Sequence, residues 1–353
     1  MRILVATSWG GACGIANYAD LAIAAIRQAD PSLEFEPSAE ALDPDWVERT
    51  RTSHPGGIGW SYDGTYGRPP TVWLNYHRGL HSRWTPEKVE ALKHYARVVI
   101  TFHDTYGERP PDDLQQQLHD LADVFVVHEP CEGLPKQILI RQGVPAATHP
   151  TRYNVWDISP EGRDFWGNYA FKQYAMQPVL GTCGFNFGWK SFDRLAEVTA
   201  VCGWAYLVQS NNATDADEAR WKAANPWTCV VRGFQPTATI VSLLAGCDAT
   251  CWAYECANSG TSGAIRLGLA ARKPVIAWQS CRQFRDLSCF DWYDPPPLPP
   301  DDRVQWCGGF AELPSILERV PIQRVDPGIV ALAERDSWVN QGKKYAAIFA
   351  GLA

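Results

Sequence analysis

The chain alternates short apolar runs with segments of helical character, and this alternation restricts its possible folds more than any other feature. Strands are expected at residues 2–7, 71–76, 97–102 and 124–128, and again at 179–183, 205–209, 228–231, 249–254 and 275–278. Helices are expected between them, including one over 134–143 that would end at Gly143, a common C-cap residue. Repeated strand–helix alternation predicts an α/β fold with parallel sheets covered by helices on both faces.

The two series of strands are separated by residues 151–177, which are aromatic, polar and irregular. We therefore predict an N-terminal domain over 1–150, a connection over 151–177, a second domain over 178–335 and a terminal helix over 336–353. A chain of 353 residues is long enough for two domains with buried cores. Both domains are expected to be Rossmann-like and doubly wound, and ligands of such sheets bind beyond the carboxyl ends of the strands.

Composition narrows the class of protein further. The eleven cysteines are scattered without a C-x-x-C pair, which favours free thiols in a reducing compartment over disulfides or a zinc site. No signal-peptide pattern and no apolar run of membrane-spanning length is present, so a cytoplasmic location is expected. The net charge is −7, and residues 1–150 hold 13 Lys and Arg against 19 Asp and Glu. This acidic half argues against docking on duplex nucleic acid.

Residues 257–277 read as a loop of small polar residues, a helix and a strand. The loop contains turn-forming residues, and Ser262 is expected to cap the helix with its hydroxyl. Such a helix start binds anions, most often phosphate, through unpaired N–H groups and the helix dipole. The candidate donor-binding residues are Ser259, Gly260, Thr261, Ser262, Gly263 and, one turn on, Arg266. The alternative is an ordinary strand-to-helix turn.

Two other turns carry candidate ligand-binding residues. Gly10 and Gly11 follow the first strand, where the absence of a Cβ permits a tight turn and close approach of a ligand. Lys190 precedes a helix in the second domain, where an ammonium can neutralise a leaving diphosphate, or can simply be an exposed charge. Phe234, in a later turn of that domain, can pack on a nucleotide base or belong to the core.

Histidines and aromatic residues suggest where an acceptor would bind. His103 and Asp104 follow an apolar strand, and a neutral imidazole there can hydrogen-bond a sugar hydroxyl. Trp60, Tyr62 and Tyr66 lie in a glycine-rich segment and offer faces for stacking on a sugar ring. His77 is a further acceptor-side candidate; with His81 it has the spacing of a metal pair, but a structural role is favoured because no third ligand is evident.

Five segments resemble the retaining nucleotide-sugar glycosyltransferases of family four, which have the GT-B fold. They are GGACGIANYA, VVITFHDT, VLGTCGFNFGWKSF, the pair LLAGCDATCWAYE and SGTSGAIRLGLAARKPVIA, and the closing SWVNQGKKYAAIF. The resemblance implies two Rossmann-like domains facing across a cleft, with the terminal helix returning to the first. It implies transfer of a sugar from a nucleoside diphosphate sugar to an acceptor hydroxyl with retention, without a metal or other cofactor.

The resemblance also assigns roles. Lys190 would contact the donor diphosphate together with Arg266 and the helix start at Ser262, and His103 would lie near the transferred sugar with Gly10 and Gly11. The acceptor would be a small molecule, a glycan or a modified nucleic-acid base. Asp215 and Asp217 resemble the metal-binding D-x-D of another glycosyltransferase fold, but at a predicted helix start they are expected to interact with the helix dipole.

The chain departs from the family at two positions. The family usually has two glutamates separated by seven residues, and Ser259 and Leu267 stand there instead. Glu255 and Arg266 are nearby candidates to replace them. Three alternatives therefore stay open: a degenerate GT-B protein that only binds nucleotide sugars, a nucleotide-sugar isomerase or epimerase, and a phage-type transferase acting on a modified DNA base.

Overall fold

The structure is a computed structural model that describes residues 1–7, 14–37, 71–77, 84–93, 96–103, 112–128, 134–147, 177–255, 262–287, 304–321 and 325–352. Contacts between Cα atoms divide the chain into two compact units. Unit 1 comprises Met1–Gly143 and Trp338–Ala353, and unit 2 comprises Val144–Asn258 and Ser262–Ser337. The predicted connection over 151–177 lies almost wholly outside the described residues. None of the described helices is long and apolar enough to cross a membrane.

Unit 1 is built on a six-stranded sheet whose paired strands are all parallel, in the order β2-β1-β3-β4-β5-β6. The strands are β1 (Arg2–Ala6), β2 (Glu34–Pro37), β3 (Thr71–Tyr76), β4 (Arg97–Phe102), β5 (Val124–Val127) and β6 (Gln137–Leu139). Alternate residues of a strand face opposite sides of a sheet, and here both sides are apolar. Leu4 and Leu74 belong to one core cluster, whereas Ile3 and Val5 belong to the other.

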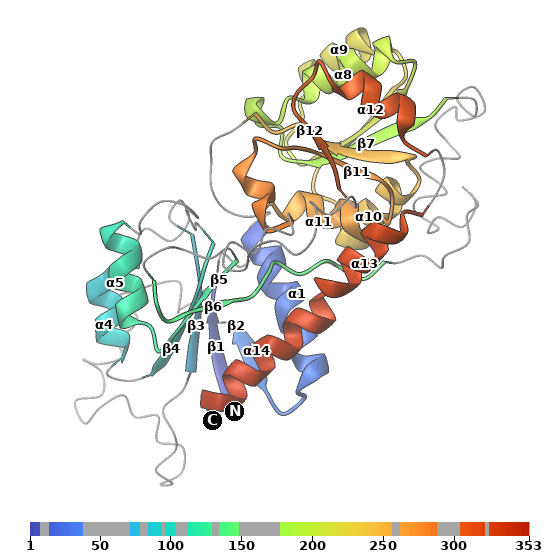
Figure 1. Ribbon diagram of the computed structural model, residues 1–353. Helices are drawn as coiled ribbons and strands as arrows, with labels where there is room; N and C mark the ends of the chain where they lie inside the picture. Colours follow the sequence, from blue (N-terminus) through green and yellow to red (C-terminus); the bar gives the residue numbers. More distant parts are fainter. Residues whose placement is uncertain are drawn as a thin grey trace, which may run out of the picture. The chain divides into compact units, whose positions relative to one another are not determined.

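Helices cover both faces of this sheet (Figure 1). One face carries α4 (Pro86–Lys93) and α5 (Asp113–Leu121), and the other carries α1 (Gly14–Ala29) and α14 (Trp338–Leu352). Figure 1 shows α14 running beside α1, and the two helices are in extensive contact. The terminal helix thus completes the core of unit 1, although it comes from the far end of the sequence.

A buried chain of polar groups also joins α14 to the sheet. The Trp73 Nε1–H donates to Thr101 Oγ1 at 2.9 Å, and Thr101 Oγ1 lies 3.1 Å from the Tyr345 hydroxyl. That hydroxyl is in turn 2.6 Å from the hydroxyl of Tyr18 on α1. Burial raises the pKa of Tyr345 to about 12 and also raises that of Tyr18, so both hydroxyls are neutral at physiological pH. Buried polar groups that satisfy one another in this way fix the position of the helices that carry them.

Unit 2 has a second six-stranded sheet with only parallel pairs, in the order β12-β11-β10-β7-β8-β9. Its strands are β7 (Val179–Gly184), β8 (Ala205–Ser210), β9 (Thr228–Arg232), β10 (Ala249–Trp252), β11 (Val275–Trp278) and β12 (Val304–Cys307). Its helices are α8 (Phe192–Val201), α9 (Asp215–Ala224), α10 (Thr237–Ala245), α11 (Gly263–Ala270), α12 (Leu313–Arg319) and α13 (Pro327–Arg335). Figure 1 shows α8 and α9 on one face of this sheet and α10 and α11 on the other.

Most expected elements are present, but the helix expected over 134–143 is wrong. The chain instead adds β6 (Gln137–Leu139) to the edge of the first sheet, paired in parallel with β5. Pro135 disfavours helical geometry at the preceding Leu134, and Ile138 and Ile140 are β-branched residues that suit a strand. Gly143 packs on Trp338 and is not a helix cap. Local residue preferences and pairing with β5 at the sheet edge therefore both favour a strand here.

The expectation of free thiols is confirmed where it can be examined. The described part of the chain contains seven free cysteines, namely Cys183, Cys202, Cys229, Cys247, Cys251, Cys281 and Cys307. Burial raises the pKa of the Cys229 thiol to about 12, and it likewise raises that of Cys251. The Cys229 and Cys251 thiols therefore stay protonated at physiological pH and behave as small apolar side chains.

Gly342 allows α14 to approach α1 closely, which gives a direct test of this packing. A Cβ at Gly342 would lie 2.6 Å from the backbone carbonyl carbon of Ala25. We expect Gly342→Ala to lower the free energy of unfolding of unit 1 by about 1–3 kcal/mol, because the two helices must separate. Gly351→Ala is the matched control, since nothing lies within 4 Å of its Cβ in the same helix. Urea denaturation measures both; equal stability of the two variants would contradict this account.

Candidate functional site

The strand order of unit 2 places a topological switch point between β7 and β10. From β7 the chain proceeds outward through β8 to β9, and then returns to β10 on the other side of β7. The helices that follow β7 and β10 therefore cover opposite faces of the sheet. Ligands of doubly wound sheets bind at such points. Two of the predicted site segments, those containing Lys190 and Ser262, follow these two strands.

The segment after β7 turns tightly and brings Lys190 back to the end of the strand. Gly184 ends β7 with φ +126°, and a short 3₁₀ helix, Gly188–Lys190, follows. A Cβ at Gly184 would lie 2.8 Å from Lys190 Nζ and 3.5 Å from the Cβ of Ala264, the second residue of α11. The ammonium group and the first turn of α11 thus meet at the same glycine.

Lys190 is not the exposed charge that was considered as an alternative. Its side chain is 7% exposed, and its Nζ lies over the rings of Phe187, Trp189 and Tyr254 at 5.7, 5.3 and 5.0 Å from their centroids. Aromatic faces attract a cation through their quadrupole, so these rings help to hold a poorly hydrated ammonium. Burial raises the pKa of the adjacent Cys183 to about 12, with Lys190 opposing the shift, so Cys183 is a neutral thiol.

The helix expected at Gly263 begins there, but it is not capped as expected. Ser262 occupies the N-cap position with extended backbone, and its hydroxyl makes no capping hydrogen bond with the described residues. By contrast, α5 and α9 are capped by Asp112 and Thr214. The backbone N–H of Ser262 donates to Gln283 O at 3.3 Å. The predicted cap by the Ser262 hydroxyl is therefore wrong, although the helix start lies at the switch point.

Arg266 faces the body of unit 2. It is 1% exposed, and its Nη1 lies 3.9 Å from Oδ2 of Asp336, the C-cap residue of α13. Asp336 also accepts hydrogen bonds from Arg335. A buried charge requires such partners, because burying an isolated charge costs several kcal/mol of hydration free energy. The structure thus places Arg266 between α11 and α13, where its charge supports the helix.

Glu255 joins the two segments of the switch point. Its backbone N–H donates to Trp189 O at 2.7 Å, and its carboxylate accepts hydrogen bonds from Ser191 Oγ at 2.9 Å and Arg194 NH1 at 2.7 Å. Glu255 follows β10, whereas the other residues follow β7 or lie in α8. Both carboxylate oxygens are engaged in this contact, which holds the Lys190 turn against the end of β10.

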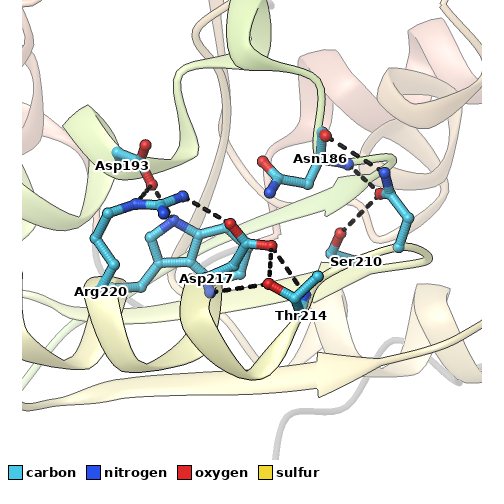
Figure 2. Close-up of polar contacts among 8 residues, drawn as sticks. Asn186, Asp193, Ser210, Thr214, Asp217 and Arg220 are labelled. Carbon is cyan, nitrogen blue, oxygen red and sulfur yellow. Dashed lines mark hydrogen bonds and ion pairs between the residues drawn. The ribbon is translucent and has the colours of Figure 1, made fainter.

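A second polar cluster lies at the ends of β7 and β8 (Figure 2). Asn212 Oδ1 accepts from the backbone N–H of Asn186, and Ser210 Oγ lies 3.5 Å from the same oxygen. Phe234, after β9, is 52% exposed and therefore does not belong to the core. Phe187, in the turn after β7, is also exposed, at 45%. The carboxyl edge of this sheet thus combines amide groups with exposed aromatic faces.

The acidic residues at the start of α9 have a structural role, as expected. Asp217 forms a capping box with Thr214, and Arg220 donates to Asp217 at 2.7 Å and to Asp193 at 2.9 Å (Figure 2). The indole N–H of the buried Trp221 also donates to Asp193. Burial acts to raise the pKa of Asp217, but hydrogen bonds from Thr214 and Arg220 outweigh it and lower that pKa. This network joins α8 to α9.

In unit 1, two histidines lie side by side at the ends of neighbouring strands. Phe102 of β4 is paired with Val127 of β5, and the next residues are His103 and His128. His103 Nδ1 lies 3.2 Å from His128 Nε2, and His128 Nδ1 lies 2.7 Å from the carbonyl oxygen of Ile140. His128 was not among the predicted residues. The signal was available, because an apolar strand ending in histidine occurs twice at the same level of the sheet.

The remaining predicted residues are distributed as follows. His77 follows β3 and is partly buried. Asp104, Gly10, Gly11, the aromatic residues Trp60, Tyr62 and Tyr66, and the loop residues Ser259, Gly260 and Thr261 lie outside the described residues, so their roles stay predictions. Among the described residues, no group of three or more His, Cys, Asp or Glu side chains converges on a common point.

Comparison with solved structures confirms the predicted GT-B fold. HepE from Anabaena, solved with UDP and glucose, superimposes with a TM-score of 0.59 at 14% identity, covering 99% of this chain and 100% of that one. The trehalose-6-phosphate synthase OtsA gives a TM-score of 0.61 at 10% identity, covering 99% and 98%. An Escherichia coli trehalose-6-phosphate structure bound with UDP-2-fluoro glucose gives 0.59 at 10%, also covering 99% and 98%.

These similarities extend over nearly the full length of both chains in each pair. At such low identity they show the two-domain Rossmann-like architecture, and they do not distinguish family four from other GT-B families. The sequence matches no protein-family model, and a search of curated proteins gives no significant match.

A substitution at Gly184 tests the geometry of the turn that carries Lys190. We expect Gly184→Ala to lower the free energy of unfolding by about 1–3 kcal/mol, because φ +126° is unfavourable for a residue with a Cβ. The new methyl group also displaces the Lys190 ammonium. Gly188→Ala is the control in the same turn, with open space around its Cβ, and should change stability by less than about 0.5 kcal/mol. Chemical denaturation measures the free energy of unfolding of both variants. A Gly184→Ala variant as stable as the wild type would contradict this account of the Lys190 turn.

Proposed function

We propose that this protein is a glycosyltransferase that moves a sugar from a nucleoside diphosphate sugar to an acceptor hydroxyl with retention. The observation that carries the proposal is the meeting of the Lys190 ammonium and the first turn of α11 beside Gly184, at the switch point of unit 2. The GT-B fold supports it, since HepE and the Escherichia coli structure were solved with UDP or a UDP sugar.

The difficult step of such a reaction is departure of the diphosphate. Negative charge grows on the phosphate oxygen as the bond to the sugar breaks, so groups that bind this charge more tightly than the ground state accelerate the step. The N–H groups at Ser262 and Gly263 and the helix dipole would supply one part of this stabilisation. Lys190 would supply the other as a positive charge in a site of low dielectric constant. In this proposal, no metal ion is required.

The surrounding residues receive supporting roles. Arg266 would hold α11 in place through Asp336, instead of contacting the donor as first expected. Glu255 would keep the Lys190 turn against β10 through Ser191. Phe234, as an exposed aromatic at the same edge of the sheet, would offer a face to the nucleotide base. Gly260, Thr261 and Ser259 would complete the loop around the diphosphate.

Residues of unit 1 would bind the sugar and the acceptor. His103, a partly exposed imidazole, would form a hydrogen bond with a hydroxyl group of one of them. Gly10 and Gly11 would line the same end of the sheet, and Asp104, His77 and the aromatic residues Trp60, Tyr62 and Tyr66 would contact the acceptor. The acceptor belongs to the small molecules, glycans or modified nucleic-acid bases with a reactive hydroxyl.

Replacing Lys190 tests the donor site. UDP at 100 times its dissociation constant should stabilise the wild-type protein by about 2.7 kcal/mol, which thermal unfolding measures as a raised Tm. We expect Lys190→Ala to lose most of this shift and most of its sugar transfer, because the diphosphate loses its charge partner. Lys222→Ala is the control, since Lys222 makes a surface ion pair with Glu218 on α9 and should leave both properties unchanged.

The outcomes of this experiment separate the candidate functions. No shift with any nucleoside diphosphate would contradict a nucleotide-sugar site. A shift without release of nucleoside diphosphate from a panel of donors and acceptors would favour a protein that only binds nucleotide sugars. An unchanged turnover in Lys190→Ala would contradict the proposed mechanism even if the protein transfers sugar.

A further inference from the structure

We infer that His128 is a positioning residue that holds His103 in one tautomer, with the proton on Nδ1 and a hydrogen-bond acceptor at Nε2. The assignment of the tautomer depends on the geometry of unit 1 alone. The use of that acceptor for a substrate hydroxyl rests on the proposed function.

The inference starts from the carbonyl of Ile140. A carbonyl oxygen only accepts hydrogen bonds, and His128 Nδ1 lies 2.7 Å from it, so His128 must carry a proton on Nδ1. His128 is 1% exposed, and Ile140 follows the edge strand β6 that pairs with β5. The backbone of the sheet therefore determines which nitrogen of this buried ring is protonated.

The proton position on His128 then determines the one on His103. A neutral His128 with its proton on Nδ1 presents a lone pair at Nε2, which lies 3.2 Å from His103 Nδ1. His103 Nδ1 must therefore donate, and the remaining nitrogen, Nε2, is an acceptor. His103 is partly exposed while His128 is buried, so the constraint runs from the interior of unit 1 to its surface.

Asn75 agrees with this arrangement. Its side-chain amide lies 3.5 Å from His103 Nε2, with the oxygen placed nearer the ring. The amide nitrogen is buried and has no hydrogen-bond partner among the described residues. The orientation of an amide group is assigned from its hydrogen bonds. As placed, the Asn75 oxygen faces the acceptor nitrogen of His103. Rotating the amide by 180° puts the Asn75 NH₂ group there instead, and it can donate a weak hydrogen bond to Nε2. At 3.5 Å this contact is weak in either orientation of the amide.

Tyr18 keeps both imidazole rings in this geometry. Its ring contacts His103 edge-on at 4.7 Å and His128 at 5.1 Å between centroids. The Tyr18 hydroxyl is itself held 2.6 Å from that of Tyr345 on α14. The two rings are thus restrained by the sheet, by α1 and, through Tyr345, by α14.

The same distances admit one competing arrangement. If His128 is an imidazolium, its Nε2 donates to His103 Nδ1, and His103 then carries its proton on Nε2, directed at Asn75 Oδ1. This arrangement has one more proton than the inferred one, and it makes His103 Nε2 a hydrogen-bond donor. Nitrogen chemical shifts distinguish the neutral Nδ1–H, the neutral Nε2–H and the imidazolium forms.

The test is NMR of the full chain labelled with ¹⁵N-histidine at pH 8, with signals assigned from His103→Gln and His128→Gln. We expect His103 in the Nδ1–H form in the wild type. In His128→Phe, which has neither donor nor acceptor, His103 should lose this preference. In His128→Gln, whose amide supplies one of each, His103 should keep it. His119→Gln, at another buried histidine of unit 1, should leave the His103 signals unchanged.

Observation of the Nε2–H form of His103 in the wild type would overturn the inference, as would an unchanged His103 spectrum in His128→Phe. If His128→Phe does not fold, the wild-type and His128→Gln spectra still decide. In a transfer assay, turnover should fall in His128→Phe and be retained in His128→Gln. Absence of any transfer by the wild type would contradict the proposed function and leave the tautomer result standing.

Discussion

Parallel pairing of strands is the constraint on which the rest of this structure depends. In each sheet the described strands run in one direction, so their carboxyl ends meet at one edge, and the loops at that edge receive the polar residues. Register then decides which residues become neighbours. His103 and His128 are 25 positions apart in sequence, and they come within hydrogen-bond distance because Phe102 is paired with Val127. The same constraint in unit 2 brings the Lys190 turn to the start of α11.

Glycines at points of close contact determine how near the helices come to these sheets. A Cβ at Gly268 of α11 would lie 1.9 Å from the indole of Trp252 on β10, and one at Gly181 on β7 would lie 2.6 Å from Cys247 Sγ. Because protein interiors are closely packed, larger side chains at these positions would move α11 or the β7 strand away. Buried glycines in unit 2 therefore help to set the position of the helix start at the switch point.

Features that depend on local sequence were predictable, and features that depend on tertiary contacts were not. The strands at Thr71–Tyr76 and Arg97–Phe102 follow from apolar runs between breakers, and the start of α11 at Gly263 follows from its small-residue loop. The prediction of a helix over 134–143 was wrong because β6 pairs with the edge of β5. Sequence spacing could not show that Lys190 would be buried among aromatic rings.

The residues around Lys190 hold this buried cation in a defined position at the end of β7. The nearby Glu255 carboxylate accepts hydrogen bonds from Ser191 and Arg194. Each aromatic contact contributes only about 0.5–2 kcal/mol, less than a charged phosphate offers at low dielectric constant. Glu255 holds the turn that carries Lys190 in two ways: its carboxylate accepts from Ser191 Oγ, and its backbone N–H donates to Trp189 O. An anion that reaches the start of α11 would then gain a charge partner that is already desolvated and in place.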